Sequence, residues 1–347
     1  MALIKHMRRI QTYLFAISLS LASTLSADFS LNPIDWVTND DKEHENLRIA
    51  SSSDEAAAES MLQSGRLKMQ SGNLSSANRT FKKIIKTYPL AVATAEARFL
   101  RARILMTRGN WKKAFDELQN VVQEHPNYEQ FNQVISAQFE CATAHMEGAR
   151  GRIFWVFPGF RQYDRAMAEF ELIVNNAPYG DYAPLALMNI ALTAQQEEEP
   201  ELAIDALDRL INYYPQSMLA PDAYYNLAET YSNLVAGSEY DQGSTRQAIS
   251  YYEDFLVLFP KSSYTGEVES NLNSMENLLS TSRLNLGDFY YYYRSNNTAA
   301  LIFYNEAITI APDSEAAQEA TTRIDDIEAG VRPTNGASVL RKLLLTD

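Results

Sequence analysis

The sequence predicts an all-α protein in which about six helix pairs stack into a solenoid. Three observations lead to this fold class. A proline recurs after amphipathic segments, and the residues upstream of each proline repeat one pattern at fixed offsets. The 347 residues are also too many for one compact core of ordinary size, so we expect an extended repeat architecture.

The second helix of each pair is defined by its proline. An alanine stands twelve residues before it, and apolar or aromatic residues stand eight and five residues before it. The two apolar positions follow the alanine by four and seven residues, so all three share one helix face, and the proline ends the helix. The prolines are Pro89, Pro126, Pro178, Pro215, Pro260 and Pro312, and the alanines are Ala77, Ala114, Ala166, Ala203, Ala248 and Ala300.

The first helix of each pair carries a small residue where the second helix can approach closely. These residues are Gly65, Ala102, Ala142, Ala191 and Ala228. In the sixth pair Asp288 stands at this position, with Gly287 next to it. Residues 264–294 predict a long first helix or two helices in line.

This pattern resembles the tetratricopeptide repeat, in which helix pairs recur about every 34 residues with small residues at the helix contacts and a proline at the end. The match covers residues 55–328. The resemblance implies a right-handed superhelical solenoid of about six tetratricopeptide-like helix pairs.

An insertion in the third repeat, residues 148–162, concentrates apolar side chains. If they are exposed, they form a docking site for a partner or a membrane surface. The alternative is that the insertion folds back to cover a gap between repeats. The candidate docking residues are Phe154, Trp155, Phe157 and Phe160.

The two ends of the chain are predicted to lie outside the solenoid. Residues 1–27 read as a secretory signal, with a basic start, a short apolar run and small residues up to Ala27. An uncleaved anchor is the alternative. No Cys ends the run, so we expect no lipid attachment. Residues 28–54 read as a flexible leader, and residues 329–347 as a C-terminal tail that caps the last repeat.

The charge, the cysteine and histidine residues and the motifs of the sequence favour a protein that binds other proteins over other functions. The net charge of −14 argues against nucleic acid as a partner. The single cysteine, Cys141, is expected to be a buried structural thiol. The histidines are scattered without a metal-ligand spacing, and no phosphate-binding loop or nucleophile motif occurs. We therefore expect no enzyme activity, no metal and no cofactor.

Partner-binding residues are expected where the first helices line the open face of the solenoid. Counted from the small residue, the positions three before, one after and four after face this groove. Core packing is the alternative for any apolar residue among them. In the fourth and fifth repeats the candidates are Met188, Leu192, Gln195, Tyr225, Glu229 and Ser232.

The run of four tyrosines, Tyr290, Tyr291, Tyr292 and Tyr293, is the second candidate surface. Consecutive residues of a helix point about 100° apart, so at least one of the four should be exposed. Tyrosine combines apolar area with a hydrogen-bonding tip and is enriched at recognition surfaces. Partner contact and packing against the next repeat both remain open.

Two further segments follow a recognisable pattern. One is the link in which proline is followed by a serine and small residues, at residues 214–223, 259–264 and 312–317. The other is the aromatic passage at 286–294, followed by 299–307. In these two segments the chain is similar to the BamD-type factors of outer-membrane β-barrel assembly. The resemblance implies a non-catalytic scaffold located in the periplasm at the inner face of the outer membrane.

The partners that this resemblance implies are an outer-membrane β-barrel assembly protein and unfolded barrel substrates. Association with the membrane would then depend on a partner. The alternative function is a general cell-envelope adaptor that coordinates cell-wall synthesis or division.

Overall fold

The computed structural model describes residues 50–148, 163–235, 237 and 242–331, and the backbone of residues 152–153 and 157–158. The predicted signal at 1–27, the leader up to residue 49 and the tail from residue 332 lie outside the described residues. So do Phe154, Trp155 and Phe160, and of Phe157 only the backbone is described.

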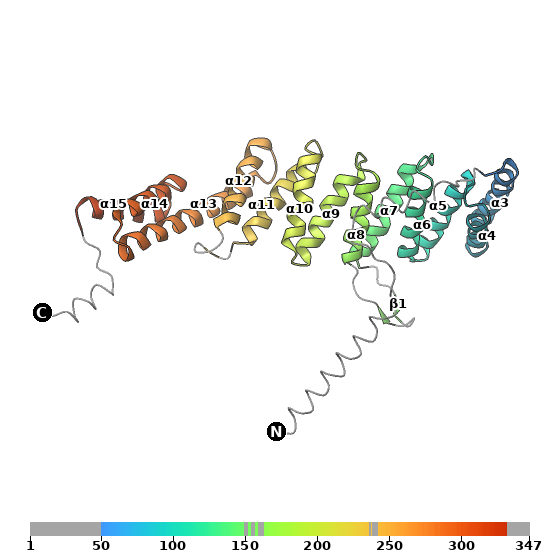
Figure 1. The fold of residues 1–347 in the computed structure, drawn as a ribbon, viewed down its shortest axis with the longest axis horizontal. Helices are drawn as coiled ribbons and strands as arrows, with labels where there is room; N and C mark the ends of the chain where they lie inside the picture. The colour runs from blue at the N-terminus through green and yellow to red at the C-terminus, as the bar shows by residue number, and fades with distance from the viewer. Residues whose placement is uncertain are drawn as a thin grey trace, which may run out of the picture. The chain divides into compact units, whose positions relative to one another are not determined.

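Thirteen α-helices are present among the described residues and form six pairs and a last single helix (Figure 1). The all-α solenoid predicted from the sequence is confirmed. The pairs are α3 (Ser52–Gln70) with α4 (Leu74–Thr87), α5 (Val92–Thr107) with α6 (Trp111–Glu124), α7 (Phe131–Met146) with α8 (Tyr163–Asn176), α9 (Tyr182–Gln196) with α10 (Pro200–Tyr213), α11 (Ala220–Asn233) with α12 (Gln242–Leu258), and α13 (Thr265–Asp288) with α14 (Asn297–Ile310). The single helix is α15 (Glu315–Glu328).

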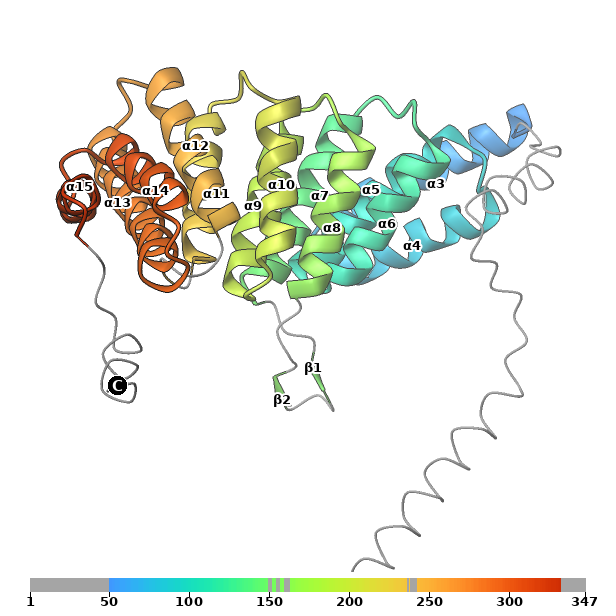
Figure 2. The ribbon, with the colours of Figure 1, turned by 60° about the vertical axis from the view of Figure 1, so that its left-hand side comes forward.

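Each helix packs mainly against the helices before and after it in the chain, as a solenoid requires (Figure 2). Two short strands, β1 (Arg152–Ile153) and β2 (Phe157–Pro158), pair antiparallel between α7 and α8. No helix in the described part of the chain is both long and apolar enough to cross a bilayer.

The core forms where the sequence pattern predicted it. The three repeated positions of the second helix are fully buried in all six pairs. Burial of this face against the neighbouring helices is the main stabilising contribution, because most helices of this length are marginal alone in water. The buried residues of the middle position are Phe81, Leu118, Phe170, Leu207, Tyr252 and Tyr304.

The turn between the two helices of a pair requires a left-handed residue. Gly72 and Gly109 occupy this place with φ of 79° and 70°. In the fourth and sixth pairs Glu198 and Ser295 take the same place, with φ of 60° and 50°. Pro200, which follows this turn, lies in the first turn of α10, where its missing N–H has no helical partner to lose.

The sixth pair differs from the others in its first helix. Helix α13 continues without a break into a π-helical turn, η3 (Phe289–Tyr293), so the two together form the long element expected at residues 264–294. Gly287 is the small contact, because a β-carbon there would collide with the ring of Tyr304. Asp288 instead accepts a hydrogen bond of 2.7 Å from the hydroxyl of Tyr304.

Helix α15 covers the end of the sixth pair. Its buried residues Ala316 and Ala320, with the half-buried Ile324 and Ile327, pack in one cluster with Tyr291 and Tyr304. The side chain of Ser314 caps the helix by accepting a hydrogen bond of 3.1 Å from the N–H of Ala317. The apolar face of the last pair is therefore covered by a helix within the solenoid.

Candidate functional site

A pocket of about 510 Å³ lies between the α9–α10 turn and helix α11. It contains three of the six groove residues predicted from the sequence, Gln195, Tyr225 and Glu229. The other residues that line it are Glu198, Pro200, Asn226, Thr230, Asn233 and Leu234. We call it the α9–α11 pocket.

Tyr225 is held between two helices. Its ring stacks on Tyr264 with a centroid distance of 5.0 Å and an interplanar angle of 10°. Its hydroxyl donates a hydrogen bond of 2.9 Å to Glu267 Oε1 in the first turn of α13. Burial and this hydrogen bond raise the pKa of Tyr225, so the hydroxyl stays protonated. The ring thus presents a fixed aromatic surface to the pocket.

Glu229 is a fixed acceptor in the same pocket. Its Oε1 accepts hydrogen bonds of 2.5 Å from the hydroxyl of Tyr252 and 2.8 Å from Asn271 Nδ2. Burial and the carboxylate raise the pKa of Tyr252. The described residues give Oε2 of Glu229 no hydrogen bond, so this oxygen can accept one from a bound molecule.

Gln195 completes a polar row along α9 and α11. Its Nε2 donates a hydrogen bond of 2.8 Å to Thr230 Oγ1, and that hydroxyl donates one of 2.7 Å to the carbonyl of Asn226. With its amide N–H₂ engaged in this way, Gln195 keeps its carbonyl oxygen as an acceptor.

The other three predicted groove residues lie outside this pocket. Leu192 is 45% exposed on α9. Met188 is only 7% exposed and packs in the main core cluster, where a partner cannot contact it. Ser232 donates a hydrogen bond of 3.5 Å to the sulfur of Met275 on α13. Packing between first helices therefore uses part of the face that we expected to be open.

The four tyrosines of the second candidate surface divide between core and solvent. Tyr291 is 1% exposed and donates a hydrogen bond of 2.9 Å to the carbonyl of Val331. Tyr292 packs under the guanidinium group of Arg323, 5.6 Å from its ring centroid. Tyr290 stacks on Phe303 at 5.4 Å. Tyr293 is 70% exposed, as expected for at least one of the four.

An exposed aromatic surface remains around Tyr293. Phe289 stacks against Tyr293 at 6.0 Å and is itself 40% exposed, and the Arg294 guanidinium lies 5.2 Å from the Phe289 ring centroid. Phe289 and Arg294 belong to the aromatic passage at 286–294, but neither was predicted from the sequence as a contact residue. The π-helical turn brings these three residues together, and we call them the η3 patch.

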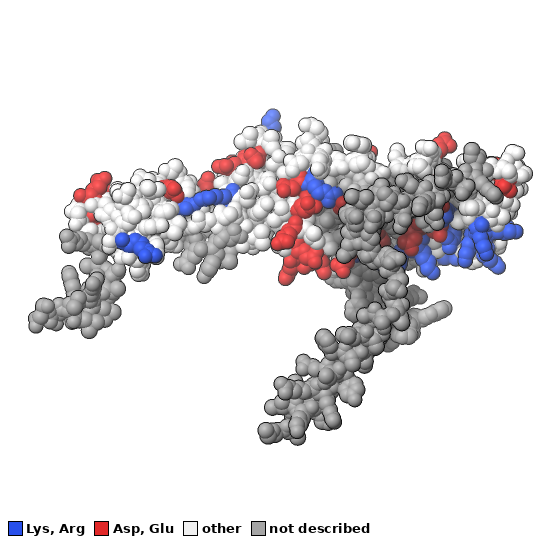
Figure 3. All heavy atoms as spheres, viewed as in Figure 1, with Lys and Arg blue, Asp and Glu red and all other residues white. Residues whose placement is uncertain are grey.

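Charge is unevenly spread over the surface. On the face shown in Figure 3, basic side chains gather over α4 and α6, and acidic side chains lie over α10. The α9–α11 pocket is next to that acidic helix, and its ionisable lining includes Glu198 and Glu229 but no Lys or Arg. The pocket therefore favours a ligand that donates hydrogen bonds or carries positive charge.

In the described part of the chain, the features that bear on catalysis are Cys141, the histidines and any group of residues that could bind a metal. Cys141 is fully buried, and its surroundings raise the pKa of the thiol, so it is not a reactive thiolate. His145 and Glu169 form a buried pair, with 2.6 Å between Nδ1 and Oε2. No cluster of three or more His, Cys, Asp or Glu residues that could bind a metal occurs among the residues searched.

Comparison with known proteins matches two parts of the chain to family models. A model described as an outer membrane lipoprotein matches residues 160–332, which include the α9–α11 pocket and the η3 patch. A model of the tetratricopeptide repeat matches residues 62–129. The two matches together cover most of the solenoid.

Curated relatives carry the name outer membrane protein assembly factor BamD. The protein of Rickettsia prowazekii is 28% identical over 134 residues, 38% of this chain and 52% of that protein. The protein of Caulobacter vibrioides is 21% identical over 128 residues, 37% of this chain and 42% of that protein. The chain thus spans about half the length of the curated relatives it matches.

Among solved structures, similar chains include a tetratricopeptide repeat protein from Parabacteroides merdae, with 11% identity, a TM-score of 0.34, and coverage of 76% of this chain and 97% of that chain. Another is the tetratricopeptide protein YrrB, with 15% identity, a TM-score of 0.33, and coverage of 70% and 97%. From its helix pairs and the sequence matches, the chain is a tetratricopeptide-repeat protein that resembles the BamD type of outer membrane protein assembly factor.

Proposed function

We propose that this chain is a non-catalytic scaffold of the cell envelope that works in the assembly of outer-membrane β-barrel proteins. The match of residues 160–332 to outer membrane lipoproteins carries the proposal, because that stretch contains both candidate surfaces. It supports a location in the periplasm, at the inner face of the outer membrane.

The α9–α11 pocket is suited to hold part of an unfolded polypeptide. Glu229 and Gln195 offer oxygen acceptors to the N–H groups of an extended segment, and Tyr225 offers an aromatic face to an apolar side chain. All three side chains are already fixed by hydrogen bonds or stacking, so little conformational freedom is lost on binding. A pocket of about 510 Å³ holds only a few side chains, which favours weak and reversible contact.

The η3 patch is suited to a folded partner. Phe289, Tyr293 and Arg294 belong to the residue types that are enriched at protein interfaces. We assign this surface to a membrane-embedded protein of the assembly machinery. The scaffold would then associate with the membrane through that partner.

Depletion of the protein in its own organism tests the proposal. Many outer-membrane β-barrel proteins should fall in amount together, while inner-membrane proteins serve as the control. Unchanged barrel levels would contradict the proposal.

Crosslinking in the native envelope tests the partners. A photoreactive residue in place of Tyr293 should crosslink to a barrel assembly protein. One in place of Leu234, which lines the α9–α11 pocket and is 37% exposed, should crosslink to unfolded barrel substrates. Recovery of peptidoglycan enzymes without any barrel protein would instead favour the general envelope adaptor.

A further inference from the structure

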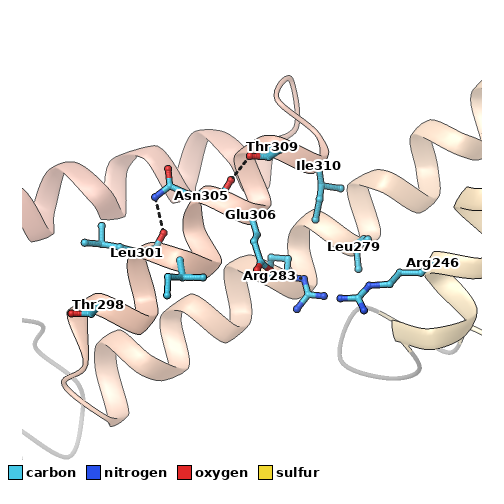
Figure 4. Close-up of a pocket in the computed structure, with 10 residues that line it drawn as sticks. Arg246, Leu279, Arg283, Thr298, Leu301, Asn305, Glu306, Thr309 and Ile310 are labelled. Carbon is cyan, nitrogen blue, oxygen red and sulfur yellow. Dashed lines mark hydrogen bonds and ion pairs between the residues drawn. The ribbon is translucent and has the colours of Figure 1, made fainter.

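A second groove, of about 830 Å³, lies along helix α14 and is bounded by α12 and α13 (Figure 4). Its residues on α14 recur every three or four positions from Thr298 to Ile310, so they form one continuous stripe. Twelve helical steps extend about 18 Å. The groove therefore has the length of a helix of about three turns.

Most of the groove is apolar. Leu279 of α13 and Leu301, Ile302 and Ile310 of α14 line it, and Ile302 is 56% exposed. The exposed Ile302 and the half-buried Leu301 lie next to each other on α14 and leave apolar area open to water, which a partner's side chains can cover.

Two arginines converge at one end of the groove. Arg246 of α12 and Arg283 of α13 both line it, and their guanidinium groups point toward each other in Figure 4. The side chain of Arg283 is 8% exposed, and its Nε lies 3.3 Å from Glu306 Oε2. Arg246 is exposed and has no hydrogen bond or ion pair with any described residue. Two cations that face each other, one of them buried, are stabilised by an anion placed between them.

The charges at this end of the groove favour a carboxylate over a phosphate group. Arg246, Arg283 and Glu306 together carry one net positive charge. One carboxylate balances that charge, whereas a phosphate group would bring up to two negative charges next to Glu306. Arginine also binds carboxylates through two parallel hydrogen bonds.

We propose that this groove binds an amphipathic helix of a partner protein, with one Asp or Glu carboxylate between Arg246 and Arg283 and with apolar side chains on Leu301 and Ile302. Recognition of this kind uses apolar anchors at helical spacing. Because the chain carries a net charge of −14, its acidic surfaces repel an acidic segment, and the arginine pair directs it to this groove.

The test uses the full chain and synthetic helical peptides of about 14 residues. Each peptide has leucines at i, i+3, i+4 and i+7 and one Glu, and the panel moves the Glu along the helix. Matched peptides replace the Glu by Gln or Lys. Fluorescence anisotropy measures the Kd of each. At least one Glu peptide should bind about tenfold more tightly than its Gln partner, and the difference should shrink at high salt.

A charge exchange identifies the site. Arg246→Glu should weaken the Glu peptide about tenfold or more and favour the Lys peptide instead. Ile302→Ser should weaken every peptide of the panel. Arg79→Glu, which changes an exposed arginine of α4, should leave all affinities unchanged. Because Arg246, Ile302 and Arg79 are exposed, these variants should fold like the parent chain.

Three results would overturn the proposal. They are equal affinities for Glu and Gln peptides, no effect of Arg246→Glu, or no binding to any peptide up to about 1 mM. Binding of phosphatidylglycerol vesicles through Arg246 in place of the peptides would assign the groove to a lipid and would also overturn it. This test measures binding of peptides to the purified chain. Its outcome is therefore independent of the depletion experiment, which tests the role in barrel assembly.

Discussion

The ring of Tyr304 lies against the backbone of Gly287, in the space that a β-carbon at position 287 would need. Both residues are buried at the contact between α13 and α14. The same relationship exists in the first pair, where the ring of Phe81 lies against Gly65. Glycine is thus required at these two positions by the close approach of an aromatic ring.

Gly287→Ala should destabilise the protein, because Tyr304 must shift and strain its hydrogen bond to Asp288. We expect a loss of about 1 to 3 kcal/mol. The urea midpoint, followed by circular dichroism, measures it. Gly266→Ala is the matched control, because it lies in the same helix with no atom near its β-carbon position, and its midpoint should be equal or slightly higher. Equal midpoints for the two variants would contradict the packing argument.

Glu198→Gly should stabilise the protein, because position 198 has a φ of 60° where Gly72 and Gly109 stand in other pairs. Glycine adopts the left-handed conformation without strain but loses more backbone entropy on folding. The net gain in the free energy of unfolding should be about 0.5 to 1 kcal/mol. Thermal unfolding measures the gain. Glu197→Gly removes a neighbouring acid where φ is −90°, and it should not stabilise. Because Glu198 lines the α9–α11 pocket, we also expect weaker partner binding, which would explain why a strained residue is kept there.

His125 should make stability fall at acid pH. Burial lowers its pKa below the ordinary value of 6.5; Glu124 opposes this shift and Arg98 adds to it. The unfolded chain therefore takes up a proton at a higher pH than the folded chain, so stability is lost as the pH falls below about 6.5. Urea midpoints at about pH 7.5 and 5.5 measure this loss in the parent and in His125→Asn. The urea midpoint of the variant should fall less between the two pH values than that of the parent. An equal fall in both proteins would exclude His125 as the cause.

Tyr225→Ala and Glu229→Gln should each weaken binding of unfolded barrel polypeptide at least about fivefold, because they remove the aromatic face and the charged acceptor of the pocket. Anisotropy with a urea-unfolded outer-membrane barrel protein, diluted into buffer, measures the affinity. Tyr213→Ala changes a tyrosine that is 74% exposed on α10 and is the control. If all three variants bind alike while keeping the same helical content, the pocket is not the binding site.

The helix pairs could be predicted from the sequence because the repeated pattern is local. Ala77, Phe81 and Ile84 fall on one face of a helix whatever surrounds it, and the following proline ends that helix. Counting from the small residue of each first helix also identified Gln195, Tyr225 and Glu229, because a position within one helix is a local property of the sequence. All three line one pocket.

Features that depend on how separate helices meet could not be predicted in this way. Met188 is equivalent by position to Tyr225, yet it packs into the core. The approach of Arg246 to Arg283 joins residues of two different repeats and has no signature in either segment. The π-helical turn places Phe289 beside Arg294. The residues of η3 would fit an ordinary α-helix equally well, so the sequence does not reveal this turn.

Within the described ranges, helix α15 follows the sixth pair as a single helix. Its outward positions are polar, among them Gln318, Glu319, Thr322 and Asp325, while Ala316 and Ala320 face the sixth pair. Another pair could not stack on such a surface without burying charge. A designer who wished to add pairs to this scaffold would therefore have to insert them upstream of α15.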